Sequence, residues 1–141
     1  MLQKSLIVVL SIMLIAVCLP GCGIESHEVS VEVTCNEFKE QPLVQRELEV
    51  TEGNTFTVTL CTSATSGFLW SEGIGISNDT VVMQVEHELK GKGMLDASSE
   101  EMWTFQALST GNCTINMGYN RPWEIDTTQK LWTLDLQVEV K

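Results

Sequence analysis

Short runs of alternating apolar and polar residues recur along the chain from Val29 onward. In each run every second residue is apolar, which is the spacing of a β-strand with one buried face. No segment shows the sustained 3.6-residue repeat that predicts an amphipathic helix. The apolar sets of the predicted strands are Val29, Val31 and Val33; Phe56, Val58 and Leu60; Val81, Met83 and Val85; Trp103, Phe105 and Ala107; Ile115, Met117 and Tyr119; and Trp132, Leu134, Leu136, Val138 and Val140.

Turn-forming triplets lie between several of these runs. They are Glu52-Gly53-Asn54, Ser77-Asn78-Asp79 and Thr110-Gly111-Asn112. Short strands separated by such turns are typical of all-β domains. We therefore predict an immunoglobulin-like β-sandwich of seven to eight strands. A small β-barrel is the alternative.

The first 21 residues have the order of a secretory signal peptide. Lys4 supplies a positive charge, and residues 6–19 form an apolar run interrupted only by Ser11. This run is shorter than the roughly 20 residues that a membrane-spanning helix needs. We interpret it as a signal that is removed, and not as part of the fold.

A cysteine follows the apolar run directly. Residues 19–22, with the sequence Leu-Pro-Gly-Cys, resemble a bacterial lipobox, in which Cys22 is lipidated and becomes the first mature residue. The alternative is ordinary secretion. We expect an extracytoplasmic lipoprotein of a prokaryotic cell envelope, held to the membrane by its N-terminal lipid. The predicted organisation is a signal peptide at 1–21, a lipidated cysteine and tether at 22–28, and one domain at 29–141.

The chain is strongly acidic, with a formal net charge of −11 at pH 7. Removal of residues 1–21 takes away Lys4 and no acidic residue, so the net charge becomes −12. Phosphate backbones repel such a chain, which argues against nucleic-acid binding. The acidity is explained by solubility or by a preference for a basic partner.

Residues suited to catalysis or metal binding are scarce. The two histidines are His27, in the predicted tether, and His87, at an apolar position of a predicted strand. His87 fits a partly buried strand histidine better than a base beside a nucleophile. No His/Cys cluster has zinc spacing, no glycine-rich phosphate loop precedes a helix, and the carboxylates are scattered. We expect no enzyme activity, no cofactor and no metal.

Two predicted loops have an unusual composition. Residues 63–70 read Ser-Ala-Thr-Ser-Gly-Phe-Leu-Trp, and residues 119–124 read Tyr-Asn-Arg-Pro-Trp-Glu. Tryptophan and arginine dominate binding hot spots, and proline lowers the entropy lost on binding. The second segment therefore predicts a protein-binding loop. The alternative is a tryptophan folded back on its own domain.

These segments resemble the chagasin family of cysteine-peptidase inhibitors. Family members carry an Asn-Pro-Thr-Thr-Gly-aromatic-x-Trp loop, a glycine-rich loop and an Arg-Pro-Trp loop. This chain departs from the pattern at Ser63, Ala64 and Ser66, and it has Asp96, Ala97, Ser98 and Ser99 where the glycines are expected. The residues that match are Thr65, Gly67, Phe68, Trp70, Tyr119, Arg121, Pro122 and Trp123.

The resemblance implies a reversible inhibitor, a monomer that occludes the cleft of a papain-like cysteine peptidase with three loops at one end of the sandwich. Thr65 is expected beside the catalytic pair of the enzyme, while Phe68 and Trp70 pack inside. A surface adhesion or carbohydrate-binding module and a structural lipoprotein domain are the alternatives. The implied peptidase-binding residues are Thr65, Ser66, Gly67, Ala97, Ser98, Arg121, Pro122 and Trp123.

Three cysteines remain in the predicted domain, namely Cys35, Cys61 and Cys113. An odd number leaves at least one free thiol or an intermolecular bond. If the first strands run up, back and up, Cys35 and Cys61 lie near the same end, although their side-chain parity disagrees. We favour a Cys35–Cys61 disulfide in an oxidising compartment, with three free thiols as the alternative.

Overall fold

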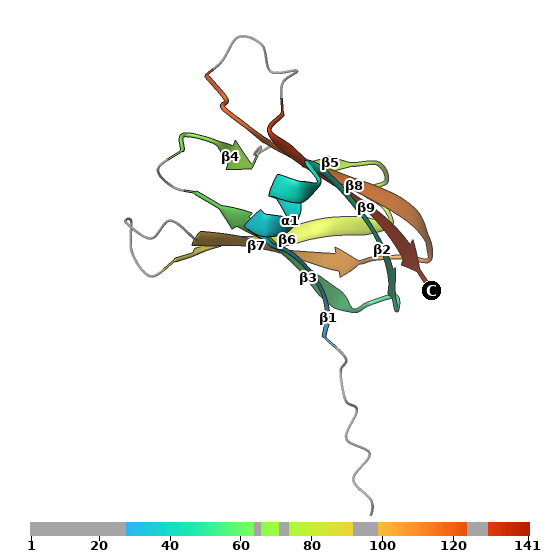
Figure 1. Ribbon diagram of the computed structural model, residues 1–141. Coiled ribbons are helices and arrows are strands. Elements are labelled where there is room, and N and C mark those ends of the chain that lie inside the picture. The colour runs from blue at the N-terminus through green and yellow to red at the C-terminus, as the bar shows by residue number, and fades with distance from the viewer. Residues whose placement is uncertain (1–27, 64–65, 71–73, 92–98, 124–129) are drawn as a thin grey trace, which may run out of the picture.

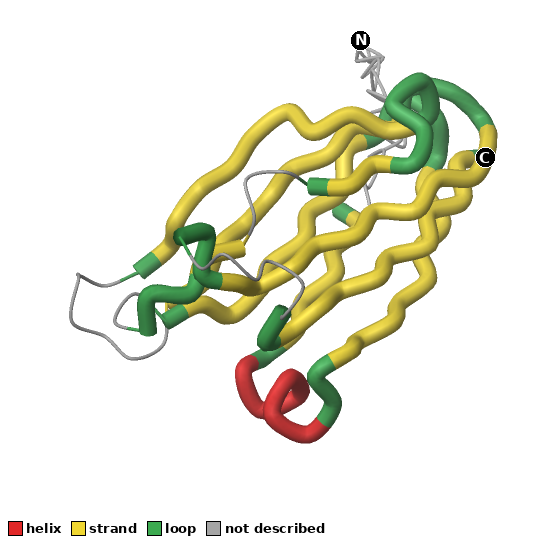
Figure 2. The backbone as a smooth tube through the Cα atoms, turned by 90° about the horizontal axis from the view of Figure 1, so that it is seen from above, coloured by secondary structure: helices red, strands yellow, loops and turns green. Residues whose placement is uncertain are grey.

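The structure is a computed structural model that describes residues 28–63, 66–70, 74–91, 99–123 and 130–141. Its strands lie in two layers, and one short helix lies at an end of them (Figures 1 and 2). The elements are β1 (Val29–Val33), α1 (Cys35–Glu40), β2 (Leu43–Val50), β3 (Thr55–Thr62), β4 (Leu69–Trp70), β5 (Gly75–Ile76), β6 (Val82–Lys90), β7 (Ser99–Ala107), β8 (Gly111–Asn120) and β9 (Trp132–Val140).

The predicted immunoglobulin-like sandwich is confirmed. One sheet has the order β1-β3-β7-β6, and the other has the order β2-β9-β8-β4 with β5 also paired to β8. Within the described residues the strands form these two sheets and no closed barrel. The described strands number nine, because β4 and β5 add two pieces of two residues each.

The alternating apolar sets predict the core correctly in five of the six runs. Their residues join one hydrophobic cluster between the two sheets, which removes apolar area from water and drives folding. Fully buried members include Phe56, Leu60, Phe105, Ile115 and Leu134. The polar residues between them face solvent on the outer surfaces of the sheets, as one-sided burial requires.

The predicted parity of β6 is wrong. Val82 is fully buried, whereas Met83 and Val85 are exposed. The register of β6 against β7 shifts between Gln84 and Glu86, so a β-bulge at Val85 breaks the period of two. β6 is also the last strand of its sheet and is exposed along most of its length. In β6 the alternation of apolar and polar residues therefore does not indicate which side chains are buried.

Besides the two-residue strands β4 and β5, two elements, β2 and α1, are absent from the sequence prediction. In β2 the residue Arg46 occupies a position of the inward-facing set and interrupts its alternation. Helix α1 has six residues, too few for a helical repeat to be recognised. Thr34 caps this helix, and Glu37 completes a capping box by accepting a hydrogen bond from the Thr34 backbone N–H. The guanidinium of Arg46 reaches Glu37 at 2.6 Å, which joins the two missed elements.

The strand directions bring the predicted loops to one end of the sandwich, here called the loop end. β3 ends where β7 begins, with Thr62 opposite Ser99. β8 ends where β9 begins, with Tyr119 opposite Trp132. β1 runs parallel to β3 and starts at the other end, where the C-terminus also lies (Figure 1). No helix among the described residues is long and apolar enough to cross a membrane.

Candidate functional site at the loop end

The first loop lies between β3 and β4, and its described residues, Ser63 and 66–68, are joined by hydrogen bonds. The backbone N–H of Ser66 donates to the carbonyl of Ser63 at 3.1 Å, and the Ser66 hydroxyl donates to the same carbonyl at 2.8 Å. The N–H of Phe68 donates to the Ser66 hydroxyl oxygen at 3.2 Å. A single serine side chain thus bridges both sides of the loop, a local bonding pattern that serine favours outside helices.

Trp70 fixes the loop where it returns to the sheet. Its indole is 3% exposed, and its Nε1–H donates to the carbonyl of Cys61 at 3.0 Å. The hydrogen bond joins the strand that precedes the loop to the strand that follows it. Phe68 is partly buried against the same core. The expectation that Phe68 and Trp70 pack inside agrees with these positions.

A disulfide lies beneath the first loop. Cys35 and Cys61 are bonded, with their Cα atoms 5.3 Å apart, and this is the pair that the sequence favours. Their disagreement in parity disappears because β1 ends at Val33 and Cys35 is the first residue of α1. Cys113 is buried and lies outside any disulfide. The bond ties α1 to the end of β3, directly before Ser63.

The Arg-Pro-Trp loop, which begins at Arg121, lies against the first loop. Trp123 is 64% exposed. A Cβ atom placed on Gly67 would lie 3.0 Å from Cζ2 of Trp123, so the indole covers the bare backbone of that glycine. The guanidinium carbon of Arg121 stands 4.4 Å from the centroid of the Phe68 ring, a cation–π distance. The two loops therefore form one surface.

The backbone of Gly67 explains why glycine is needed there. Its φ is +74°, in the left-handed region that side chains disfavour. Glycine also lets the Trp123 indole approach. The sequence does not reveal the contact with Trp123, which depends on how the two sheets pack.

The structure does not describe all of the predicted site residues. Ser66, Gly67, Arg121, Pro122 and Trp123 lie together at the loop end. Ser99, which the sequence places in the loop equivalent to the family's glycine-rich loop, is instead the first residue of β7 and is 4% exposed. Its side chain is therefore buried. Thr65, Ala97, Ser98 and the predicted lipidation site Cys22 lie outside the described residues.

His87 contacts an aromatic ring and a carboxyl group, both on the neighbouring strand β7. Its ring stacks on Trp103 with centroids 4.7 Å apart, and its Nε2 lies 3.0 Å from Oε2 of Glu101. The side chain of His87 is 45% exposed, so it is more open than the partly buried histidine we expected. Glu101 is buried, and the hydrogen bond with His87 gives its side chain a polar partner. Within the described ranges, no group of three potential metal ligands was found.

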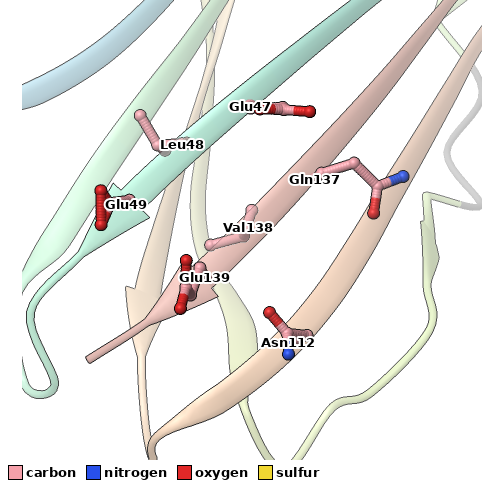
Figure 3. A pocket seen from close by; sticks show the side chains of 7 residues that line it. All are labelled: Glu47, Leu48, Glu49, Asn112, Gln137, Val138 and Glu139. Carbon is pink, nitrogen blue, oxygen red and sulfur yellow. The ribbon is translucent and has the colours of Figure 1, made fainter.

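A shallow hollow on the outer face of the second sheet lies away from the loops. Its volume is about 620 Å³, and Glu47, Glu49 and Glu139 line it together with Leu48, Asn112, Gln137 and Val138 (Figure 3). Lys141 pairs with Glu49 and Glu139 at its rim. Five of its seven lining residues are polar or acidic. It lacks the convergent polar groups in an apolar cleft that typify a ligand site.

The fold and its paired loops define a class of protein, a β-sandwich that presents binding loops at one end. The sequence model of the family described as chagasin family peptidase inhibitor I42 matches residues 49–138, which run from the end of β2 into the end of β9. The chain belongs to this family. The family is one of peptidase inhibitors and not a class of enzymes.

Solved structures share this fold. The cysteine protease inhibitor EhICP2 from Entamoeba histolytica superposes with a TM-score of 0.62 and 22% identity, over 82% of this chain and 98% of that one. PbICP-C, described in complex with falcipain-2, gives a TM-score of 0.57 and 15% identity, over 80% of this chain and 99% of that one. A search of curated proteins found no match.

Proposed function

We propose that this protein is a reversible inhibitor of papain-like cysteine peptidases and that its loop end occludes the active-site cleft. The observation that carries the proposal is the joint surface of Gly67 and Trp123, with Arg121 held over Phe68 beside it. An exposed tryptophan on a rigid base is the kind of residue that dominates protein–protein binding. Family membership and the complex of PbICP-C with falcipain-2 support the choice of target class.

Inhibition of this kind requires no chemistry from the inhibitor. In our proposal Thr65 and Ser66 approach the catalytic cysteine and histidine, and Trp123 contacts the enzyme surface beside the cleft with Arg121 and Pro122. Ala97 and Ser98 belong to the loop that reaches the substrate groove. The first loop is braced by Ser66 and Trp70, and such preorganisation limits the entropy lost on binding.

The test is a titration of the full chain, purified in mild detergent, against papain and other papain-like peptidases. We expect tight, reversible inhibition, with enzyme activity restored on dilution. A serine peptidase such as trypsin is the control and should retain full activity. The proposal fails if no papain-like enzyme is inhibited at micromolar concentration. Binding to a glycan array in that case would support the adhesion alternative, which also uses exposed Trp123.

We further propose that Cys22 is lipidated and that the domain is anchored, as a monomer, outside the cytoplasm of a prokaryotic cell. β1 starts at the end of the sandwich remote from the loops, so a tether that precedes it leaves the loop end unobstructed. Mass spectrometry of the membrane fraction should find diacylglyceryl and acyl masses on Cys22. A Cys22→Ala variant should appear in the soluble fraction, and an unmodified mature chain that begins elsewhere contradicts the proposal.

A further inference from the structure

Tyr119 is the chain's one tyrosine, and its ring is packed from three directions at the loop end. It stacks on Trp132 at 4.9 Å, with planes 9° apart, and contacts Trp70 at 4.9 Å and Phe68 at 5.5 Å between centroids. The residue is 1% exposed. Such packing fixes the direction in which the phenol hydroxyl points.

The hydroxyl of Tyr119 points at the base of the first loop. It accepts a hydrogen bond from the backbone N–H of Ser63 at 3.0 Å, and it lies 3.3 Å from the hydroxyl of Ser66 and 3.5 Å from that of Thr62. The Ser66 hydroxyl gives its own hydrogen to the Ser63 carbonyl. Toward Tyr119 it can therefore only accept, so the phenol O–H is the donor in that pair.

Tyr119 also stands two residues before Arg121 on the same chain segment. The strand that supports the Arg-Pro-Trp loop thereby carries the hydroxyl that holds the first loop. A phenylalanine would fill the same space and keep the ring contacts. The hydroxyl is thus unnecessary for the apolar core, but its loss leaves the partly buried N–H of Ser63 without this acceptor.

We propose that the Tyr119 hydroxyl is a positioning group for inhibition, which fixes the first loop relative to the Arg-Pro-Trp loop before the peptidase arrives. The inference rests on the proposed function. Its physical basis is preorganisation, because a loop that is already ordered loses less entropy on binding. Tyr119 itself is buried and need not touch the enzyme.

The primary test compares Tyr119→Phe with the wild-type full chain as inhibitors of papain. We expect the inhibition constant to rise about tenfold, a loss typical of one intramolecular hydrogen bond at an ordered site. A slower association rate should account for part of the rise, because the first loop has the binding conformation in fewer of the variant molecules. Thr114→Val is the matched control. It removes another hydroxyl of β8, which bonds Gln137 away from the loop end, and should leave inhibition unchanged.

Ser66→Ala removes the same contact from the other side without altering the core, so it serves if Tyr119→Phe folds poorly. The loss in the double variant should be smaller than the sum of the two single losses, because the two substitutions share the Tyr119–Ser66 hydrogen bond. Fully additive losses would overturn the inference. So would a Tyr119→Phe variant that inhibits as well as the wild type.

Amide hydrogen exchange at Ser63 gives a readout that does not depend on inhibition. The Ser63 amide should exchange faster in Tyr119→Phe, while amides of the far end, such as that of Gly53, stay unchanged. Unchanged exchange at Ser63 would refute the positioning role. If the wild type fails to inhibit papain while Ser63 exchange still depends on the hydroxyl, the target assignment fails and the structural coupling stands.

Discussion

The backbone of Gly67 and the indole of Trp123 are in direct contact, and this contact joins two loops that are far apart in the chain. A Cβ on Gly67 would meet Cζ2 at 3.0 Å and Cη2 at 3.1 Å, distances that are too short for ordinary packing. Each loop is therefore part of the environment of the other. Substitutions in the first loop should change how the Arg-Pro-Trp loop binds.

We predict that Gly67→Ala weakens peptidase inhibition at least about tenfold by displacing Trp123. The added methyl collides with the indole, which is exposed and can swing outward. The positive φ adds strain, which we expect to lower the free energy of unfolding by about 1 kcal/mol. Inhibition constants against papain and thermal unfolding of the same preparation measure the two effects.

Gly53→Ala is the control for Gly67→Ala. Gly53 has a φ of +85° and nothing within 4 Å of a Cβ position, so alanine there brings strain without a collision. Gly53 lies at the end remote from the loops, where its N–H bonds Ala107. It should lose similar stability and keep full inhibition. If both variants inhibit equally well, the Gly67–Trp123 contact has no role in binding.

Trp123→Ala should cost about 2 kcal/mol or more of binding free energy, which is about a thirtyfold rise in the inhibition constant. The side chain is 64% exposed, so thermal stability should hardly change. Leu108→Ala removes another exposed apolar side chain, next to the end of β7 and away from the loops, and should leave inhibition intact. An unaltered inhibition constant for Trp123→Ala would remove this residue from the binding surface.

The sequence predicts the sandwich and its loops because each rests on a local pattern. A strand with one buried face must alternate, so five of the six apolar sets are correct. β2 is not predicted because Arg46 occupies a position of the inward-facing set, where its side chain stays 39% exposed and pairs with Glu37. The bulge at Val85 shifts the register of β6, so the alternating pattern predicts the wrong buried residues in that strand. The contact of Gly67 with Trp123 is tertiary and has no local signal.

Helix α1 could have been predicted from Thr34 and Glu37, whose spacing is that of a capping box. The Tyr119 hydroxyl offers a weaker signal, since a tyrosine in the otherwise apolar inward-facing set of β8 suggests a buried polar partner. Which partner it has depends on the fold of the first loop. The sequence thus identifies the binding loops but not the groups that hold them in place.

Loss of the Cys35–Cys61 disulfide should destabilise the domain and loosen the first loop. The bonded residues are separated by 26 positions, for which the chain-entropy estimate is about 3.5 kcal/mol. We expect Cys35→Ala/Cys61→Ala to unfold at lower denaturant and to inhibit more weakly, because the disulfide holds the end of β3, where the Cys61 backbone carbonyl accepts the Trp70 hydrogen bond. Non-reducing peptide maps of the wild type should join the two cysteine peptides. Finding both thiols free would contradict the bond.

The last prediction concerns acid stability through Glu37. The backbone N–H of Thr34 is the main cause that lowers the pKa of the Glu37 carboxyl below its usual 4.5; partial burial opposes it, and the Thr34 hydroxyl and Arg46 lower it further. A carboxyl whose pKa is lower in the folded state stabilises that state most when ionised. This contribution is fully present above about pH 4.5 and is lost as the pH falls through the folded pKa.

Glu37→Gln is the informative variant, since glutamine preserves a capping box but carries no charge. At pH 7 the wild type should resist urea better than Glu37→Gln, and the difference should vanish as the pH falls toward 3. Comparing the two proteins cancels the titration of the other carboxyls. The Glu37 side chain is 40% exposed, so we expect a small effect that added salt reduces further. A difference that stays constant from pH 7 to pH 3 would mean that the charge of Glu37 contributes nothing and that only its hydrogen bonds hold the helix.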